Sequence, residues 1–152
     1  EHKGGARVVE TWVRPGGDKL VLAKPNTFMN VSGTPVAALA RFYSVPPEQV
    51  IVVHDELDIP FDTVKLKIGG GHGGHNGVRD IARALTTPEF PRVRVGIGRP
   101  VGRQDPADWV LSPFGKDERA NLPILVSDGA DAVELLVEEG LLSAQQKHHA
   151  PR

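Results

Sequence analysis

The sequence contains no cysteine among its 152 residues. Disulfide bonds, cysteine-ligated zinc sites and thiol nucleophiles are therefore excluded. No apolar run approaches the roughly 20 residues that a membrane-spanning helix requires. The first residues do not have the pattern of a signal or transit peptide. We therefore expect a cytoplasmic protein that makes no contact with membranes.

Three motifs of common enzyme classes are also missing. The glycine-rich stretch at residues 69–77 is not followed by Lys and then Ser or Thr, so a Walker A phosphate-binding loop is excluded. There is no Gly-x-Ser-x-Gly elbow, and because cysteine is absent as well, a covalent acyl-enzyme is not expected. A His-x-x-x-His pair is absent too, which argues against a metal site, and we expect no cofactor.

The remaining composition is that of an ordinary globular protein. Hydrophobic residues make up 39% of the chain and charged residues 24%, values that favour a folded domain with a buried core. A length of 152 residues fits one domain rather than two. We therefore expect a single domain over residues 1–152, with a mobile tail over residues 143–152.

The most unusual segment is Gly69-Gly70-Gly71-His72-Gly73-Gly74-His75-Asn76. The alternating residues before it predict a strand, and the apolar spacing after it predicts a helix. A glycine loop between a strand and a helix start can present free backbone N–H groups to an anion. The alternative is a tight turn that needs glycine for its geometry alone.

The same segment also matches the fingerprint of dinucleotide-binding folds, as Gly69-x-Gly71-x-x-Gly74. That fingerprint requires an acidic residue about 20 residues further on, after the next strand. Here the next predicted strand, Arg92–Gly98, is followed by Arg99. An arginine at this place could bind the 2′-phosphate of NADP, so a dinucleotide-binding enzyme stays open as one alternative.

Charge is distributed unevenly along the chain, although the formal net charge is only −1. Residues 65–103 contain eight Lys and Arg against two acidic residues, a net charge of +6. Residues 105–142 contain nine acidic residues against two basic ones, a net charge of −7. A local basic segment around a glycine loop indicates a phosphate-bearing partner, and two oppositely charged solvated faces are the alternative.

Strand and helix patterns alternate along the chain, which predicts the α/β class with a mixed sheet between helices. The predicted strands are Arg7–Val13, Lys19–Ala23, Val50–Val53, Val64–Ile68 and Arg92–Gly98, and the predicted helices follow Ser32, follow Asn76 and span Asp117–Leu142. Ser32 or Thr34 could cap the first helix with a hydroxyl. The continuous apolar run Val50–Val53 predicts a central strand that is covered on both faces. Gly140 is expected to stop the last helix.

Polar residues follow directly after the buried strand Val50–Val53. The carboxyl end of such a strand is where α/β folds place their catalytic groups. Asp55 could therefore orient a histidine that acts as a general base. Metal binding by Asp55, Glu56 and Asp58 is the alternative.

Phe28, Met29 and Asn30 lie between a predicted strand and a predicted helix, where polar turn residues would be expected. An exposed aromatic ring beside an amide can stack on a base and hydrogen-bond to a nucleotide. The alternative is that Phe28 and Met29 are buried in the core.

Four motifs, taken together and in this order, resemble the bacterial-type peptidyl-tRNA hydrolases. They are Phe28-Met29-Asn30-x-Ser32-Gly33, His54-Asp55-Glu56-Leu57-Asp58, the glycine stretch with His75-Asn76-Gly77, and Arg92-Val93-Arg94-Val95-Gly96-Ile97-Gly98. The resemblance covers nearly the whole chain. It implies a monomeric three-layer α/β/α sandwich with a mixed, mainly parallel central sheet. It also implies hydrolysis of the ester between a peptide and the 3′ end of tRNA, which recycles tRNA after stalled or aborted translation, without a metal.

The resemblance also implies roles for individual residues. Those implied to bind the tRNA acceptor end, its 3′ terminus or the peptide are Phe28, Met29, Asn30, Asn76, Lys67 and Arg94. Among them, Lys67 and Arg94 would bind the terminal phosphate. Asp55 would keep a catalytic histidine in its basic form, and Asn76 would position the water or the developing oxyanion.

One part of the family pattern is absent. The family begins with a strand that ends in Asn-Pro-Gly and continues to a Thr-Arg-His-Asn motif, whose histidine is the general base. None of the six histidines of this chain has that context. We expect that the 152 residues lack this N-terminal part, with its first strand and helix. A non-catalytic tRNA-binding relative of the same fold is the alternative.

Overall fold

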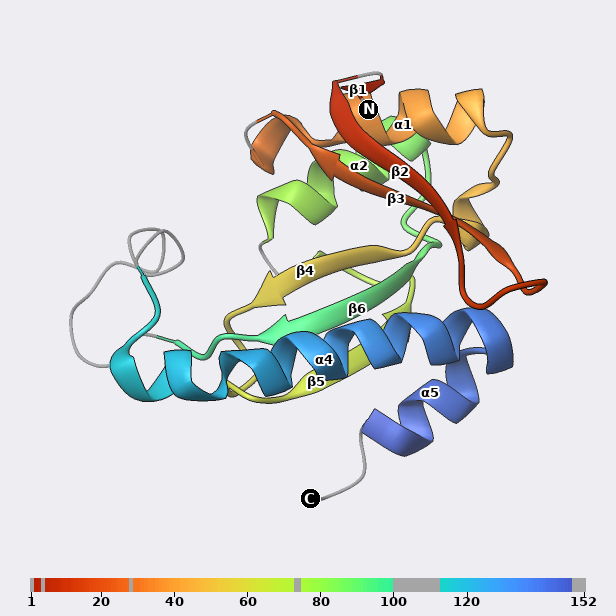
Figure 1. Cartoon of the computed structure of the whole chain (residues 1–152). Helices are drawn as coiled ribbons and strands as arrows, with labels where there is room; N and C mark the ends of the chain where they lie inside the picture. Colours follow the sequence, from red (N-terminus) through yellow and green to blue (C-terminus); the bar gives the residue numbers. More distant parts are fainter. Residues whose placement is uncertain (1, 4, 28, 73–74, 100–112, 149–152) are drawn as a thin grey trace. The chain divides into compact units, whose positions relative to one another are not determined.

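The computed structural model describes residues 2–3, 5–27, 29–72, 75–99 and 113–148 (Figure 1). The chain divides into two compact units. The first unit comprises Glu1–Val52 and Ile68–Pro91, and the second comprises Val53–Lys67 and Arg92–Arg152. Each unit contains strands and helices, so the predicted α/β class is confirmed.

The first unit contains an antiparallel sheet in the order β1-β2-β3. Its strands are β1 (His2–Lys3), β2 (Ala6–Trp12) and β3 (Lys19–Pro25). The strands β2 and β3 form the predicted hairpin, in which Val8 lies opposite Ala23. Ala6 and Val8 point to the same side of β2, are buried, and pack with Leu39 in a small core.

Helical segments make up the rest of the first unit. They are η1 (Met29–Val31), α1 (Gly33–Phe42), η2 (Pro47–Gln49) and α2 (Asn76–Leu85). Both α1 and η1 pack against α2. On its inner side α2 contributes Val78 and Ile81 to a core with the fully buried Phe90. The two predicted helices are confirmed, but Ser32 makes no side-chain cap to α1, so that detail of the prediction is wrong.

A mixed sheet in the order β4-β6-β5 is the centre of the second unit. Its strands are β4 (Val52–Glu56), β5 (Val64–Ile68) and β6 (Pro91–Gly96). Figure 1 shows β4 and β6 running in the same direction. β5 runs antiparallel to β6, because the N–H of Gly96 donates to the carbonyl of Thr63 and the N–H of Gly69 donates to the carbonyl of Phe90. The predicted mixed sheet is therefore confirmed.

The prediction that Val50–Val53 forms a covered central strand is wrong for the strands that the structure describes. β4 lies at an edge of its sheet, and the Val53 side chain is 53% exposed. An apolar run predicts that a segment forms a strand, but it does not predict which strands pair with it. It therefore cannot distinguish an edge strand from a central one.

Two helices accompany the sheet of the second unit, α4 (Lys116–Glu139) and α5 (Leu141–His148). A Cβ atom at Gly129 of α4 would lie 3.8 Å from Val95 of β6, so α4 packs on one face of the sheet. The Nε2 of Gln145 in α5 donates to the carbonyl of Leu66 at 3.1 Å. Because β5 is an edge strand, this bond satisfies a carbonyl that points away from the sheet.

Residues 143–148 of the expected tail, which spans residues 143–152, belong to helix α5. Gly140 does end α4, with a φ of 91°, but the chain then begins helix α5. Ala144 is fully buried and Gln145 is bonded to β5, which explains why residues 143–148 are helical. Residues 149–152 lie outside the described part of the chain.

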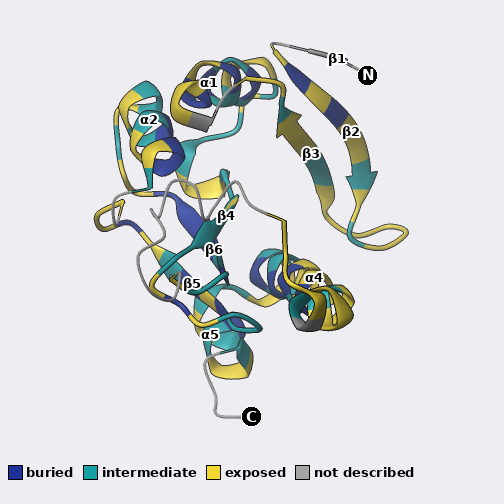
Figure 2. Ribbon diagram, turned by 90° about the vertical axis from the view of Figure 1, so that its left-hand side faces the viewer, coloured by how far each residue is buried: buried dark blue, intermediate teal, exposed yellow. Residues whose placement is uncertain are grey.

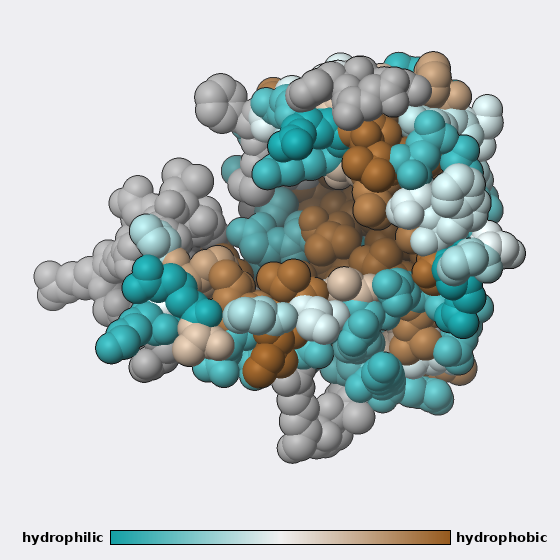
Figure 3. Space-filling model, in the orientation of Figure 1, coloured by the Kyte–Doolittle hydropathy of each residue, from teal (hydrophilic) through white to brown (hydrophobic). Residues whose placement is uncertain are grey.

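The two units differ in which of their elements are buried. In Figure 2, β6 begins with three buried residues, whereas most of β3 is exposed. Figure 3 shows hydrophobic side chains among hydrophilic ones along α4, where Ile124 is 52% and Val126 63% exposed. Among the residues that the structure describes, no helix combines the length and the apolar character needed to cross a membrane.

Candidate functional site

The predicted site residues are distributed over both units. In the first unit, Asn30 lies in η1 and Asn76 is the first residue of α2, and both are exposed. Met29 begins η1, and Phe28 lies outside the described residues. Because η1 packs against α2, the first unit brings the Met29–Asn30 segment and the helix that begins at Asn76 together.

The start of α2 is fixed by a histidine cap. His75 has an extended backbone, and its ring Nδ1 accepts the N–H of Val78 at 3.1 Å. This is the arrangement of a helix N-cap, in which a side chain accepts one of the otherwise unsatisfied N–H groups. Nδ1 is thus the acceptor of this bond. The cap sets the point where the helix begins, and therefore the place of Asn76.

The glycine loop has a clear conformational reason at its beginning. Gly69 and Gly70 have φ angles of 72° and 79°, a region that side chains other than glycine rarely adopt. A Cβ at Gly69 would also lie 2.5 Å from the carboxylate of Glu89. The interpretation as a tight turn therefore accounts for these two glycines, while Gly71 has open space around it.

In the second unit, four cations lie on one face of the sheet. The two bonds that pair β5 with β6 set a register in which Lys67 lies opposite Arg92 and Lys65 opposite Arg94. Opposed residues, and residues two apart along a strand, point to the same face. The other face of this pair carries Leu66 and other apolar residues, toward α4. The predicted residues Lys67 and Arg94 thus lie on neighbouring strands of one basic face.

This basic face is partly desolvated. Arg92 is only 1% exposed, and Lys67 and Arg94 are half-buried. Burial, followed by the positive charges of Arg92 and Arg94, lowers the pKa of Lys67, and the carboxylate of Glu56 opposes this shift. The Nε of Arg94 is buried and makes no hydrogen bond with the described part of the chain. An anion placed here would relieve the repulsion among these cations.

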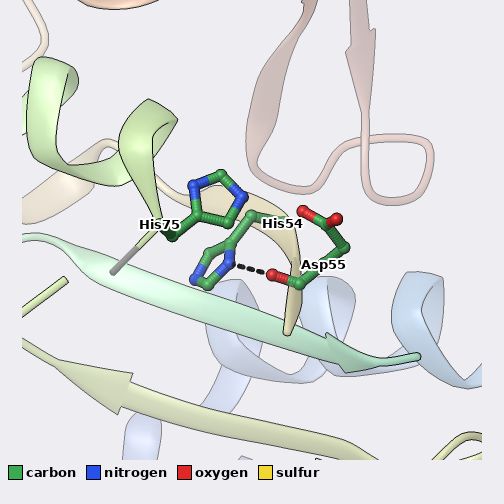
Figure 4. Close-up of side chains that lie close together, drawn as sticks. All are labelled: His54, Asp55 and His75. Atoms are coloured by element: carbon green, nitrogen blue, oxygen red, sulfur yellow. Dashed lines mark hydrogen bonds between the residues drawn. The ribbon is translucent and has the colours of Figure 1, made fainter. Parts of the chain in front are cut away.

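Asp55 and His54 are neighbours at the carboxyl end of β4. The Nδ1 of His54 lies 2.7 Å from the backbone carbonyl oxygen of Asp55 (Figure 4). A carbonyl oxygen only accepts, so Nδ1 carries the proton and Nε2 is the basic nitrogen of His54. A carboxylate oxygen of Asp55 and a ring nitrogen of His54 lie within 4.8 Å of each other. The backbone of Asp55 thus helps to orient the His54 ring.

Two alternatives from the sequence lose support in the second unit. Arg99 donates through Nε to the carboxylate of Asp58 at 2.7 Å. This hydrogen bond lowers the pKa of Asp58. A carboxylate paired in this way is a poor candidate for a metal site with Asp55 and Glu56, and an arginine paired in this way is a poor candidate for binding a 2′-phosphate.

Sequence reasoning missed two sets of residues. Lys65 and Arg92 were counted in the basic segment but were not predicted as site residues, although the alternation of basic and apolar residues in both strands carried that signal. Asp80 was missed altogether. Its carboxylate accepts the N–H of Gly33, a residue 47 positions earlier, and no local pattern indicates such a partner.

The chain is similar to known proteins over nearly its whole length. The family model for peptidyl-tRNA hydrolase matches residues 2–152. The peptidyl-tRNA hydrolase of Pseudarthrobacter chlorophenolicus is 62% identical over 148 residues, which cover 97% of this chain and 76% of the relative. That of Nocardia farcinica is 58% identical over 147 residues, which cover 97% of this chain and 75% of the relative.

Solved structures give the same result. A crystal structure of peptidyl-tRNA hydrolase from Acinetobacter baumannii superposes with a TM-score of 0.83 at 32% identity, and the match covers 97% of this chain and 74% of the other. Family model, relatives and structures agree with the four motifs in the sequence. This chain therefore belongs to the peptidyl-tRNA hydrolase family, whose members hydrolyse the ester bond between a peptide and its tRNA.

Proposed function

We propose that this chain acts on peptidyl-tRNA by binding its acceptor end and hydrolysing the peptide ester, as a monomer in the cytoplasm. The observation that carries the proposal is the basic face of β5 and β6, where Lys67 and Arg94 lie diagonally across the two paired strands. A nucleic-acid substrate requires such a cluster, because phosphate contacts supply most of the binding free energy. Membership in the family supplies the reaction.

Lys67 and Arg94 are proposed to bind the terminal phosphate of the tRNA. Both side chains are half-buried, so their charges are less screened than those of surface residues. The lowered pKa of Lys67 means that its charge is disfavoured without an anion, and an incoming phosphate would compensate for this. Arg94 offers a planar fork that can make two parallel hydrogen bonds to phosphate oxygens.

The first unit is proposed to bind the 3′ end and the peptide. Asn30 and Asn76 present exposed amides, each with both a donor and an acceptor, which suits a peptide backbone or a ribose. Phe28 is proposed to contact the acceptor end or the peptide as well, and Met29 is proposed to line the surface that binds them. The packing of η1 on α2 supports a common role for the two segments that carry these amides.

The proposed chemistry is direct attack of water on the ester carbonyl. A histidine takes a proton as the water oxygen bonds to the carbonyl carbon, and it returns the proton to the 3′ oxygen as the ester C–O bond breaks. The Asp55 carboxylate is proposed to keep that histidine basic and to stabilise its charged form. Asn76 is proposed to donate a hydrogen bond to the water or to the developing oxyanion.

The experiment that tests this proposal is hydrolysis of an N-acetyl-aminoacyl-tRNA by the 152-residue chain, with binding of the same tRNA measured in parallel. Turnover that Asp55→Asn abolishes would support the full proposal, with His54 or His75 as the first candidates for the base. Turnover that survives Asp55→Asn would refute the role of Asp55. Absence of both turnover and binding would refute the proposal as a whole.

A second candidate function is tRNA binding without catalysis. It is favoured by the fact that none of the six histidines lies in the sequence context of the family's general base. Binding that Lys67→Ala weakens, with no turnover by this chain or by a longer chain that includes the family's Thr-Arg-His-Asn motif, would support it. Turnover by either chain would exclude it.

A further inference from the structure

We propose that Asp80 is a positioning residue for substrate binding: it fixes the η1 turn, and with it Asn30, on helix α2. No part of the family resemblance points to Asp80. The inference rests on the proposed function, because it takes Asn30 as a contact to the acyl end of the substrate. All the contacts that carry it lie within the first unit.

Asp80 replaces the missing cap of α1. The residue at the N-cap position, Ser32, has a helical backbone and makes no capping hydrogen bond with its side chain. Instead, the N–H of Gly33, the first residue of α1, donates to Oδ2 of Asp80 at 2.7 Å. A carboxylate at a helix N-terminus satisfies an otherwise unpaired N–H and interacts favourably with the helix dipole. The start of α1 is therefore bonded to the middle of α2.

The two helices are also in close backbone contact at this point. A Cβ at Gly33 would lie 2.3 Å from the backbone oxygen of Asp80 and 2.8 Å from the Cβ of Ala84, so only glycine fits. Ser32 and Gly33 are both buried. The η1 turn, Met29–Val31, comes immediately before this contact and packs on α2 itself. Asn30 is exposed, but it is only three residues from a fixed backbone position.

The Asp80 carboxylate is itself held in place. Nε and Nη2 of Arg83 lie 3.0 Å and 2.9 Å from Oδ1, which leaves Oδ2 for Gly33. Desolvation opposes ionisation of Asp80. The hydrogen bonds from the Gly33 N–H and from Arg83, together with the charges of Arg83 and Arg79, outweigh it and lower the pKa. The carboxylate therefore stays charged well into the acidic range.

Losing the bond between Asp80 and Gly33 should have a selective effect. It would leave the buried N–H of Gly33 without its partner and release η1 from α2. Contacts made by Asn30 to the acyl end would weaken, because the amide would have to be ordered again on binding. Contacts to the terminal phosphate are proposed to come from the second unit and should not change.

The test uses two ligands that differ only at the 3′ end. Both are 5′-phosphorylated acceptor-stem minihelices; one carries an N-acetyl-aminoacyl group through a stable amide, and the other ends in a 3′ hydroxyl. Asp80→Ala is expected to weaken binding of the acylated minihelix about tenfold and to leave binding of the other unchanged. Asp80→Asn keeps an oxygen acceptor for Gly33 and should restore most of the affinity. Arg83→Gln is the matched control, because it leaves the bond to Gly33 in place.

A double-mutant cycle shows whether Asp80 acts through Asn30. Asp80→Ala combined with Asn30→Ala should bind the acylated minihelix no more weakly than Asn30→Ala alone. If Asp80→Ala does not fold, Asp80→Asn carries the cycle with a smaller loss of affinity, since a neutral amide is a weaker acceptor than a carboxylate. Additive losses, or equal losses with both minihelices, would overturn the inference. If Asn30→Ala itself leaves the affinity for the acylated minihelix unchanged, the role of Asn30 in the proposed function is wrong instead.

Discussion

The two units position their candidate binding residues by different means. In the first unit, Asn30 and Asn76 are amides next to helix ends, and single hydrogen bonds that His75 and Asp80 accept fix those ends. In the second unit, Lys67 and Arg94 are cations on neighbouring strands, and the pairing of β5 with β6 fixes them. A helix end depends on one or two bonds, whereas a strand register depends on a whole ladder.

This difference indicates how each kind of recognition should fail. Amides that must match a carbonyl or a hydroxyl need precise geometry, so small changes in their support should matter. Cations that attract a phosphate act over a longer range, so they tolerate displacement but not the loss of charge. Binding by the first unit should therefore be sensitive to substitutions of the residues that support its amides. Binding by the second unit should be sensitive to substitutions that remove a positive charge.

The largest effect is expected for Phe90→Ala. The ring is fully buried beneath α2, with Val78 and Ile81. Its removal should lower the free energy of unfolding by about 3–5 kcal/mol, as measured by urea denaturation. Phe42→Ala is the matched control, because Phe42 is 65% exposed. Equal destabilisation by the two substitutions would contradict the assignment of this core.

The next largest effect concerns the basic face. Lys67→Ala and Arg94→Ala should each weaken binding of a 5′-phosphorylated acceptor duplex about tenfold, because each removes a charge-assisted hydrogen bond. Each should also reduce the slope of log K against log salt by about one. Lys116→Ala, on the exposed start of α4, is the control. Losses that are just as large for a duplex without the 5′-phosphate would show that these residues bind elsewhere on the RNA.

A smaller effect is expected at the cap of α2. His75→Ala removes the acceptor for the N–H of Val78 and should cost about 1 kcal/mol of stability in urea denaturation. His75→Asp should retain most of this stability, because a carboxylate can accept the same N–H and is favourable at a helix N-terminus. His72→Ala, which changes an exposed side chain in the same loop, serves as the control. If all three variants were equally stable, the ring would not be acting as a cap.

The pH dependence of phosphate binding should show the effect of neighbouring positive charges on Lys67. Burial and the charges of Arg92 and Arg94 lower the pKa of Lys67 below the usual 10.5, so binding should decline at a lower pH than for an ordinary lysine. Between the folded and the unfolded pKa the unfolded chain binds more protons, so the contribution of Lys67 to stability increases as pH rises through the folded pKa. Arg94→Gln removes one cause of the shift. Its binding profile, scaled to its own plateau, should decline at a higher pH than that of the unchanged chain.

The sequence predicted the basic face better than the helix ends, and the reason is physical. The alternation in Val64–Ile68 and in Arg92–Gly98 has a period of two, which places every second residue on one face whatever the rest of the chain does. The hairpin and the helix α2 were likewise predicted, since local turn residues and apolar spacing carry their own signal.

The parts that sequence reasoning missed depend on partners far along the chain. Ser32 has the right chemistry for a cap, but Asp80 takes that role from 47 residues away. Residues 143–148 have little helical pattern of their own, and their helix depends on Gln145 reaching Leu66. Val50–Val53 is apolar enough for a central strand and still lies at an edge of the described sheet. In each case tertiary contacts override the local signal.

The smallest effect is expected at the ion pair of Asp58 and Arg99, and it separates two functional classes. Both side chains are more than half exposed, so water and salt screen their attraction. Arg99→Ala should therefore leave the melting temperature unchanged, with Lys116→Ala as a second exposed cation for comparison. It should also leave binding of the phosphorylated duplex unchanged, because Arg99 lies outside the pair of strands that carries the basic face.

A dinucleotide-binding enzyme would behave differently, since NADP would raise the melting temperature and Arg99→Ala would remove that increase. Such a result would mean that the glycine loop binds a nicotinamide cofactor and not RNA. It would also contradict the proposal that one unit binds the substrate through amides and the other through cations.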